Sequence, residues 1–262
     1  MRTNLVKRRL GEGNLVLGTM IFEFNTTGIG HIVAAAGAEF VIFDMEHTGW
    51  SMETIRGLLA ATRAADTVPM VRVPATEYHF IARALDLGAM GVMVPMVESG
   101  AQAARIMAAA KYAPDGMRGA AFGVAHDDYV VGDIATTLRQ ANDEGLLIAQ
   151  IETAAGVDQA EEIAATTGID VIWIGQFDLT TSLGIPGQTD HPRYVEAEAA
   201  VLQACSQAGK VAAVMTLDMP SSHAAIQRGF RMVAYGGDLW LYCAALKRGL
   251  DELRGSNIAP SR

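Results

Sequence analysis

Residues 39–73 read EFVIFDMEHTGWSMETIRGLLAATRAADTVPMVRV, and this stretch decides the fold. It contains two short apolar runs, at 40–44 and 69–73, which are nearly continuous rather than alternating. Such runs are typical of strands that are buried on both faces. The residues between them, METIRGLLAATRAA (52–65), have the character of a helix. The stretch therefore predicts a strand, a crossover helix and a second, parallel strand.

The same alternation continues along the whole chain. Six further strand candidates occupy residues 15–19, 91–95, 146–152, 171–175, 211–216 and 231–236. Several helical stretches between them end in a glycine that fits a helix C-cap, namely Gly168, Gly209 and Gly229. Eight strands alternating with helices in 262 residues predict a parallel (β/α)8 barrel that forms one domain over residues 1–262.

A doubly wound open sheet is the alternative α/β architecture. A GxGxxG fingerprint after the first strand would favour it, but the glycines of GTMIFEFNTTGIG (18–30) have a different spacing. We therefore favour the barrel. The final residues, IAPSR after position 257, are expected to be loose.

Composition and charge exclude several classes of function. The net charge of −9 argues against a nucleic-acid-binding protein, which needs basic patches. No apolar run is long enough for a membrane span, and the basic N-terminus lacks the apolar core of a signal peptide. Cys205 and Cys243 are too isolated for a disulfide framework or a zinc site, so we expect buried thiols in a cytoplasmic protein.

Reactive side chains gather where the predicted strands end. In a (β/α)8 barrel the carboxyl ends of all strands meet at one face, and the active site lies there. The residues at these positions are Asp44, Glu46, His47, Arg72, Glu152 and Asp178. Strand ends are often polar for structural reasons, so any single one of these residues is weak evidence for an active site. The location of all six at one face is stronger evidence.

Two of these carboxylates are candidates for a metal site. Glu152 and Asp178 follow adjacent strands, and two carboxylates completed by water suit a hard divalent cation such as Mg²⁺ or Mn²⁺. The structural alternatives are a helix cap for Glu152 and a turn residue for Asp178.

The cluster after the second strand suggests proton transfer. A carboxylate from Asp44 could hold the His47 imidazole in one tautomer and make it a general base. Alternatively, His47 binds a loop and Asp44 caps a helix. Glu46 lies between them and is expected to point away from Asp44 as a structural partner.

Arg72 lies within the apolar run PMVRV (69–73), where an unpaired guanidinium would be prohibitively costly. It must therefore face either a carboxylate of the barrel or an anionic oxygen of a substrate.

His126 lies in a glycine-punctuated loop, where a solvated role is the simpler interpretation.

Several longer segments carry a family resemblance. They are FDMEH (43–47), VRVP (71–74), GVMVPMVESGAQAARIMAAAKYAPDGMRG (91–119), QIET (150–153) and GIDVIWIGQFDLTTSLG (168–184). Together they resemble the HpcH/HpaI family of class II, metal-dependent pyruvate aldolases, over nearly the whole chain from Gly18 to Ala245.

The resemblance implies a role for each matched position. Glu152 and Asp178 would bind a divalent metal (Mg²⁺, Mn²⁺ or Co²⁺), with Gln150 beside them. The backbone of residues 175–177 would bind the substrate carboxylate; these residues are Gly175, Gln176 and Phe177.

The resemblance also implies the proton-transfer groups. Asp44 and His47 would form the acid–base pair, Arg72 would contact the keto oxygen, and Asp86 would be a further acid near the site. The reaction would be reversible cleavage of 4-hydroxy-2-oxo acids to pyruvate or hydroxypyruvate plus an aldehyde. Family members are commonly hexamers, built as a dimer of trimers and often with an exchanged C-terminal helix.

Three departures from the family pattern affect the substrate. Gln176 and Phe177 replace a usual Pro-Ala pair, a tryptophan near the first strand end is replaced in the GTMIFEF segment (18–24), and the loop GVAHDDYV (123–130) lacks an arginine that some members have. A long dicarboxylic product is therefore less expected, and the acceptor aldehyde stays open.

Other functions use the same scaffold, because fold does not fix function. An oxaloacetate decarboxylase would use the same enolate, whereas an acyl-CoA-linked lyase would need a basic cluster that this acidic chain does not show. A non-catalytic 2-oxo acid binding protein would be expected to lose Asp44, His47 or Arg72, all of which are present.

Overall fold

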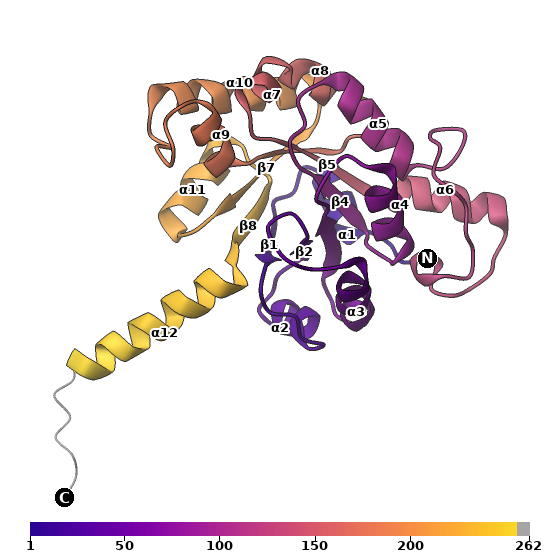
Figure 1. The fold of residues 1–262 in the computed structure, drawn as a ribbon, viewed down its shortest axis with the longest axis horizontal. Coiled ribbons are helices and arrows are strands. Elements are labelled where there is room, and N and C mark those ends of the chain that lie inside the picture. The colour runs from indigo at the N-terminus through magenta and orange to yellow at the C-terminus, as the bar shows by residue number, and fades with distance from the viewer. Residues whose placement is uncertain (256–262) are drawn as a thin grey trace, which may run out of the picture.

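A computed structural model describes residues 1–255 and contains a closed barrel of parallel strands in chain order, with β1 paired to β8 (Figure 1). The strands are β1 Val16–Ile21, β2 Phe40–Asp44, β3 Val68–Arg72, β4 Gly91–Val94, β5 Leu146–Ile151, β6 Val171–Ile174, β7 Val211–Thr216 and β8 Met232–Gly237. All eight predicted strands are present, so the predicted (β/α)8 barrel is confirmed and the open sheet is excluded.

Helices surround the barrel. They are α1 Leu5–Gly11, α2 Ile29–Ala35, α3 Met52–Thr62, α4 Tyr78–Asp86, α5 Gly100–Ala110, the 3₁₀ turn η1 Ala125–Asp127, α6 Ile134–Glu144, α7 Ala154–Asp158, α8 Ala160–Ala165, α9 Gln176–Ser182, α10 Pro192–Ala208, α11 Met219–Arg228 and α12 Asp238–Gly255. Gly209 and Gly229 are left-handed C-caps, as predicted. Gly168 is left-handed as well, but it follows the C-cap of α8, which is Thr166.

Strand alternation divides the core into two layers. One set of apolar side chains fills the barrel interior, and Val6 and Leu10 of α1 belong to this set. The other set packs between the strands and the surrounding helices. Successive residues of a strand point to opposite faces, so the inward series Phe40 and Ile42 leads to position 44, and Ile148 leads to position 150. Polar residues that continue an inward series therefore emerge at the carboxyl end of the barrel.

Gly18 illustrates how tightly the interior is filled. A Cβ at this position would overlap both the backbone oxygen and the ring of Phe40 on the neighbouring strand. Glycine in β1 is thus what allows the Phe40 ring to lie inside the barrel.

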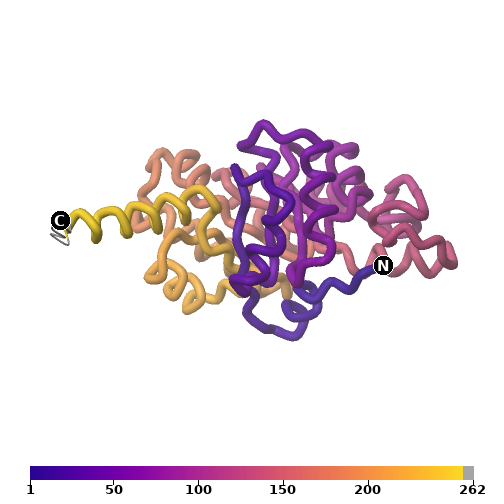
Figure 2. Tube along the Cα trace, turned by 90° about the horizontal axis from the view of Figure 1, so that it is seen from below, coloured from indigo at the N-terminus to yellow at the C-terminus, as the bar shows by residue number. Residues whose placement is uncertain are grey.

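Beyond its first turns, where Trp240 and Tyr242 contact Phe22 and Phe24, the last helix α12 extends away from the barrel (Figures 1 and 2). Its large side chains are exposed, including Trp240, Tyr242, Leu246, Leu250 and Leu253. Cys243 is exposed on the same helix, so the prediction of a buried thiol was wrong there, whereas it is confirmed for Cys205. Within residues 1–255, no helix combines the length and apolar character needed to cross a membrane. The predicted loose IAPSR tail lies outside the described residues.

Asp238, at the start of α12, fixes the loop that follows β1. Its buried carboxylate accepts hydrogen bonds from the backbone N–H groups of Phe22 (2.9 Å), Glu23 (2.9 Å) and Phe24 (2.6 Å). The Asp238 side chain therefore links the segments that follow the first and last strands, β1 and β8, at the carboxyl face of the barrel.

We expect Asp238→Ala to lower the free energy of unfolding by about 2–4 kcal/mol, because it leaves several backbone donors without partners. Urea unfolding followed by circular dichroism would measure this. The matched control is Asp251→Ala on α12, where the carboxylate is half exposed and pairs with Lys247 and Arg254. That change should cost less than about 1 kcal/mol. Equal losses for the two variants would contradict the assigned role of Asp238.

Candidate active site

The floor of the candidate site is an ion pair between neighbouring strands. The parallel register of β2 and β3 places Asp44 directly beside Arg72. Nε of Arg72 donates to Oδ1 of Asp44 at 2.5 Å, and Nη1 of Arg72 lies 3.0 Å from Oε2 of Glu46. Asp44 is fully buried and Arg72 is 7% exposed. Of the two partners considered for Arg72, the structure thus shows a carboxylate of the barrel.

Asp44 also shapes the turn after β2. Its Oδ2 accepts the backbone N–H of His47 at 2.9 Å, its Oδ1 accepts that of Glu46 at 3.2 Å, and its carbonyl oxygen accepts the Thr48 hydroxyl at 2.6 Å. Because both carboxylate oxygens are already bound to backbone N–H groups and to Arg72, Asp44 does not hold the His47 imidazole as predicted. The imidazole is half exposed, and its Nε2 lies 3.7 Å from Oε2 of Glu46.

Glu46 points into the site, which contradicts the expectation that it would point away. Burial raises its pKa to about 7; Arg72 opposes that shift, while Asp44 and Asp178 add to it. Strand periodicity could not show this placement, because β2 ends at Asp44 and Glu46 lies in the turn that follows. Glu46, not Asp44, is therefore the carboxylate nearest the imidazole.

Glu152 lies directly after β5 and is almost completely buried. Its Oε1 accepts the backbone N–H of Met96 at 2.7 Å, and its Oε2 accepts a short hydrogen bond from Nε2 of Gln150. Burial raises the pKa of Glu152 to about 7, against the hydrogen bond from Gln150, and the charges of Glu46 and Asp178 raise it further. The other polar atom of the Gln150 amide, its carbonyl oxygen Oε1, is buried and has no hydrogen-bond partner among residues 1–255.

The turn from β6 into α9 closes over Glu152. A Cβ on Gly175 would overlap the Glu152 carboxylate and lie 2.7 Å from Cβ of Glu152 and 3.0 Å from Nε2 of Gln150, so this close approach requires glycine. Asp178 follows in the first turn of α9 and is exposed. Its charge acts on both Glu46 and Glu152, so the three carboxylates face a common region.

A hollow of about 90 Å³ opens above these groups at the carboxyl ends of the strands. Seven of the residues assigned to the site from the sequence line it: His47, Arg72, Gln150, Gly175, Gln176, Phe177 and Asp178. The remaining lining residues are Met20, Phe22, Trp173, Ile174, Met215 and Trp240. The structure thus brings together most of the positions that the strand ends and the resemblance indicated.

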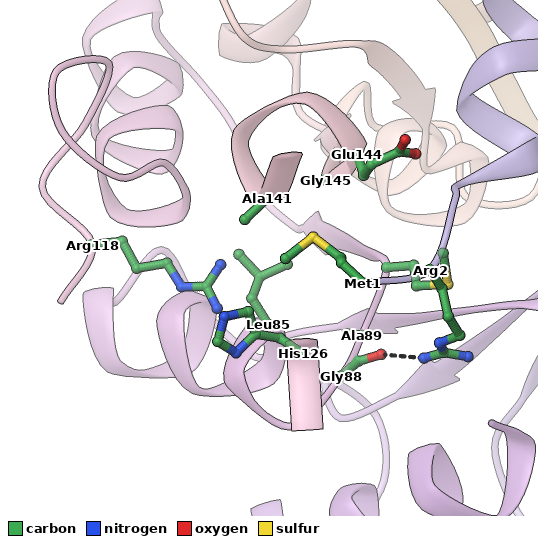
Figure 3. Close-up of a pocket in the computed structure, with 11 residues that line it drawn as sticks. Met1, Arg2, Leu85, Gly88, Ala89, Arg118, His126, Ala141, Glu144 and Gly145 are labelled. Atoms are coloured by element: carbon green, nitrogen blue, oxygen red, sulfur yellow. Dashed lines mark hydrogen bonds between the residues drawn. The ribbon is translucent and has the colours of Figure 1, made fainter. Parts of the chain in front are cut away.

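Asp86, unlike these residues, does not lie at the carboxyl end of the barrel in this chain. It ends α4, which leads to the start of β4 and hence to the amino end of the barrel. Its carboxylate accepts from Nη2 of Arg118 at 2.5 Å and from Nε at 3.2 Å. Arg118 and His126 lie side by side at a separate small hollow that Met1 and Arg2 also line (Figure 3). Asp86 therefore stands apart from Glu152 and Asp178, because its helix runs antiparallel to the strands.

The donor groups at the carboxyl end fit a divalent cation. Within residues 1–255, no three or more His, Cys, Asp and Glu side chains are arranged as metal ligands. The two carboxylates that the resemblance implies as ligands, Glu152 and Asp178, would leave the remaining positions to water. Asp44 and Glu46 pair with the guanidinium of Arg72. The charge of Asp178 acts on both Glu46 and Glu152, and the pKa values of these two acids are raised. An added cation would relieve this repulsion, and hard ions such as Mg²⁺ keep several water ligands.

Comparison with known proteins agrees with this geometry. The family described as HpcH/HpaI aldolase/citrate lyase matches residues 23–245. The chain belongs to this family. It is accordingly a carbon–carbon lyase of the aldolase type.

Individual relatives cover nearly the whole chain. A hydroxypyruvate/pyruvate aldolase of Roseobacter denitrificans is 32% identical over 90% of this chain and 91% of its own length. A 5-keto-4-deoxy-D-glucarate aldolase of Klebsiella pneumoniae is 30% identical over 85% and 86%. The crystal structure of an HpcH/HpaI aldolase from Desulfitobacterium hafniense superimposes with a TM-score of 0.92 at 30% identity, covering 100% of both chains.

The raised pKa of Glu46 predicts a pH-dependent stability. Burial favours the protonated carboxyl, so its contribution to stability is complete below pH 4.5 and is lost as the pH rises through about 7. In metal-free protein, Glu46→Gln should therefore gain stability relative to the wild type between pH 5 and pH 8, by about 1–2 kcal/mol. Thermal unfolding at both pH values would measure this.

The control for this measurement is Glu161→Gln, an exposed carboxylate on α8. Its stability difference from the wild type should be the same at both pH values. If Glu46→Gln destabilised the protein equally at pH 5 and pH 8, the carboxyl would not titrate as described.

Proposed function

We propose that this aldolase reversibly cleaves 4-hydroxy-2-oxo acids to pyruvate or hydroxypyruvate plus an aldehyde, using a divalent cation (Mg²⁺, Mn²⁺ or Co²⁺) held by Glu152 and Asp178. The observation that carries the proposal is the single buried guanidinium among carboxylates at the carboxyl face of the barrel. The names of the hydroxypyruvate/pyruvate aldolase relatives support the choice of donor.

The lysines of the chain support a mechanism without a Schiff base. None of the four lysines lines the hollow, and each is bound elsewhere. Nζ of Lys111 donates to the carbonyls of Asn142 and Gly145, and Nζ of Lys210 donates to that of Ile169 at 2.7 Å. Lys7 pairs with Asp170, and Lys247 pairs with Asp251 on α12. Carbonyl activation must therefore be electrostatic.

Arg72 is the protein group that performs this activation. Negative charge develops on the 2-oxo oxygen when a proton is removed from the adjacent carbon or when the carbon–carbon bond breaks. Asp44 and Glu46 hold the guanidinium in place, so it can stabilise that charge without rearranging. When bound, the cation would add Lewis-acid stabilisation of the same oxygen.

His47 is the group proposed to transfer the proton. Its imidazole lines the hollow and is half exposed, so it can reach a substrate hydroxyl or methyl group. Imidazole is suited to both accepting and donating a proton near neutral pH. Glu46, 3.7 Å away, would stabilise the protonated imidazole.

The turn at residues 175–177 is proposed to receive the substrate carboxylate, as the resemblance implies. Gly175 supports this because, lacking a side chain, it lets the turn lie against Glu152 and Gln150. A carboxylate bound there would lie next to both proposed metal ligands, so one 2-oxo acid could contact the turn and Arg72 together.

The other functions on this scaffold are less well supported. Coenzyme A would need cations for its phosphates, and within the described chain Arg72 is the one Arg or Lys side chain among the residues of the hollow. Oxaloacetate decarboxylation would use the same groups and is compatible as a second activity. A purely binding role is disfavoured because Arg72, His47 and Glu152 are assembled as a reactive set.

We also propose that the enzyme is a cytoplasmic homo-oligomer, with the hexamer common in the family as the expected state. Leu246, Leu250 and Leu253 follow the helical spacing of one face of α12 and are all at least 40% exposed. A projecting apolar stripe of this kind usually marks a protein–protein contact. The unpaired thiols of Cys205 and Cys243 suit a reducing compartment.

Light scattering after size exclusion would test the oligomer. The wild type should elute as a multimer, and replacing the three leucines together by glutamine should shift it toward the monomer. A matched control replaces the exposed Lys247 and Arg254 of the same helix by glutamine and should leave the mass unchanged. A monomeric wild type would refute this part of the proposal.

The enolate chemistry can be tested before any aldehyde is known. We expect the methyl protons of pyruvate to exchange in D₂O, observed by NMR, only with protein and added Mn²⁺ or Mg²⁺. His47→Ala should lower the exchange rate at least about 100-fold, because general acid–base catalysis alone contributes that much. Glu152→Gln should also lower it strongly, because it removes a proposed ligand of the cation. Controls are His223→Ala and Glu161→Gln, which change exposed residues on α11 and α8. Lack of exchange with pyruvate, hydroxypyruvate or other 2-oxo acids would refute the proposed function.

A further inference from the structure

We propose that the acceptor aldehyde of this enzyme is uncharged and carries an aliphatic or aromatic group. This inference rests on the proposed function and concerns the half of the product that the 2-oxo acid does not supply. A substrate whose 2-oxo acid end reaches Arg72 and Glu152 must place its other end toward the opening of the hollow. The side chains at that opening therefore select the aldehyde.

Aromatic and methionine side chains line the hollow from its buried end to its opening. They come from four strand ends that are far apart in the sequence, and they are Met20, Phe22, Trp173, Phe177, Met215 and Trp240. Met20 and Trp173 are buried deep in the hollow, whereas Phe177 is 48% exposed and Trp240 is 42% exposed. Two large rings thus offer apolar surface to the opening, which a hydrophobic group on a substrate would cover.

The Phe22 and Trp240 rings are held together as a unit. Their centroids lie 4.9 Å apart in an edge-on arrangement. Gly237 allows this contact, because a Cβ there would lie 2.7 Å from the Trp240 ring and 2.8 Å from the Phe22 ring. The three backbone hydrogen bonds to Asp238 fix the loop that carries Phe22. This part of the wall is preorganised, so an apolar group can bind it without ordering new side chains.

The charges of the hollow disfavour a second carboxylate on the aldehyde. Arg72 is the one Arg or Lys side chain that lines the hollow in the described chain, and its pairing with Asp44 and Glu46 keeps it at the floor. A carboxylate at the far end of the substrate would therefore meet the exposed rings of Phe177 and Trp240, with no Arg or Lys side chain among the described residues to bind it.

Phe177 is the residue we assign to this selection. It lies at the start of α9, one position before Asp178, lines the hollow and is half exposed. A large ring at this position adds apolar surface and narrows the opening. The acceptor would thus contact the Phe177 side chain, while the 2-oxo acid contacts the backbone of the same turn.

Two matched pairs of aldehydes test the inference. 4-Methylpentanal has the shape of 4-oxobutanoate with methyl groups in place of the carboxylate oxygens, and 2-methylpropanal has the same relation to glyoxylate. With pyruvate as donor and Mn²⁺ present, initial rates of pyruvate consumption give kcat/KM for each aldehyde. We expect the uncharged member of each pair to be preferred at least tenfold by the wild type.

Variants of Phe177 show whether this residue is responsible. Phe177→Ala should reduce the preference for 4-methylpentanal about tenfold, and Phe177→Arg should reverse it in favour of 4-oxobutanoate. The ratio within a pair is the readout, so a general loss of activity or of donor binding does not affect it. Ile32→Ala, which removes an exposed apolar side chain on α2 outside the hollow, should keep the wild-type ratio.

The outcomes separate this inference from the proposed function. Preference for the carboxylate members, or no preference, in a wild type that still exchanges pyruvate protons would overturn the acceptor assignment alone. A wild-type preference that is unchanged in both Phe177 variants would overturn the assignment to Phe177. Absence of both proton exchange and aldol formation would overturn the proposed function and the acceptor assignment with it.

Discussion

The ion pair between Asp44 and Arg72 is the interaction on which the rest of the site depends. It exists because the β2–β3 register sets the last residue of one strand beside the last residue of the next. A buried guanidinium is tolerable only with such a partner, and the partner is tolerable only with the backbone N–H groups that Asp44 also accepts. The pair therefore fixes Arg72 at the floor and, through the same carboxylate, fixes the turn that carries Glu46 and His47.

The site contains more carboxylates than the one guanidinium of Arg72 can neutralise. Glu46 and Glu152 respond with pKa values near 7, because each is buried close to other carboxylates. Strongly perturbed acids in a concave site are a common property of catalytic centres. The buried carboxylates lower the stability of the folded protein. They also form a site that a cation and an anionic 2-oxo acid would complete together.

Much of this could be predicted from the sequence, for reasons that differ between fold and site. The strands were identifiable because burial on both faces demands continuous apolar runs, and the barrel followed from their regular alternation with helices. The strand ends then indicated where Glu152 and Asp178 would lie. What the sequence did not predict was how side chains compete for partners: Asp44 binds backbone and Arg72 in place of the His47 imidazole.

The other predictions that differ from the structure concern residues on helices, not residues on strands. Asp86 was assigned to the site from resemblance alone, yet it ends α4 at the amino end of the barrel, where Arg118 pairs with it. Cys243 was expected to be buried because its surroundings are apolar, but α12 projects from the barrel and exposes those side chains. An apolar stripe predicts that a helix will be covered, and it does not say whether its own chain or another copy covers it. In β2, β3 and β5 this ambiguity is absent, because both faces of these strands are buried within the chain, and this is why their inward series predicts the site better than any helix does.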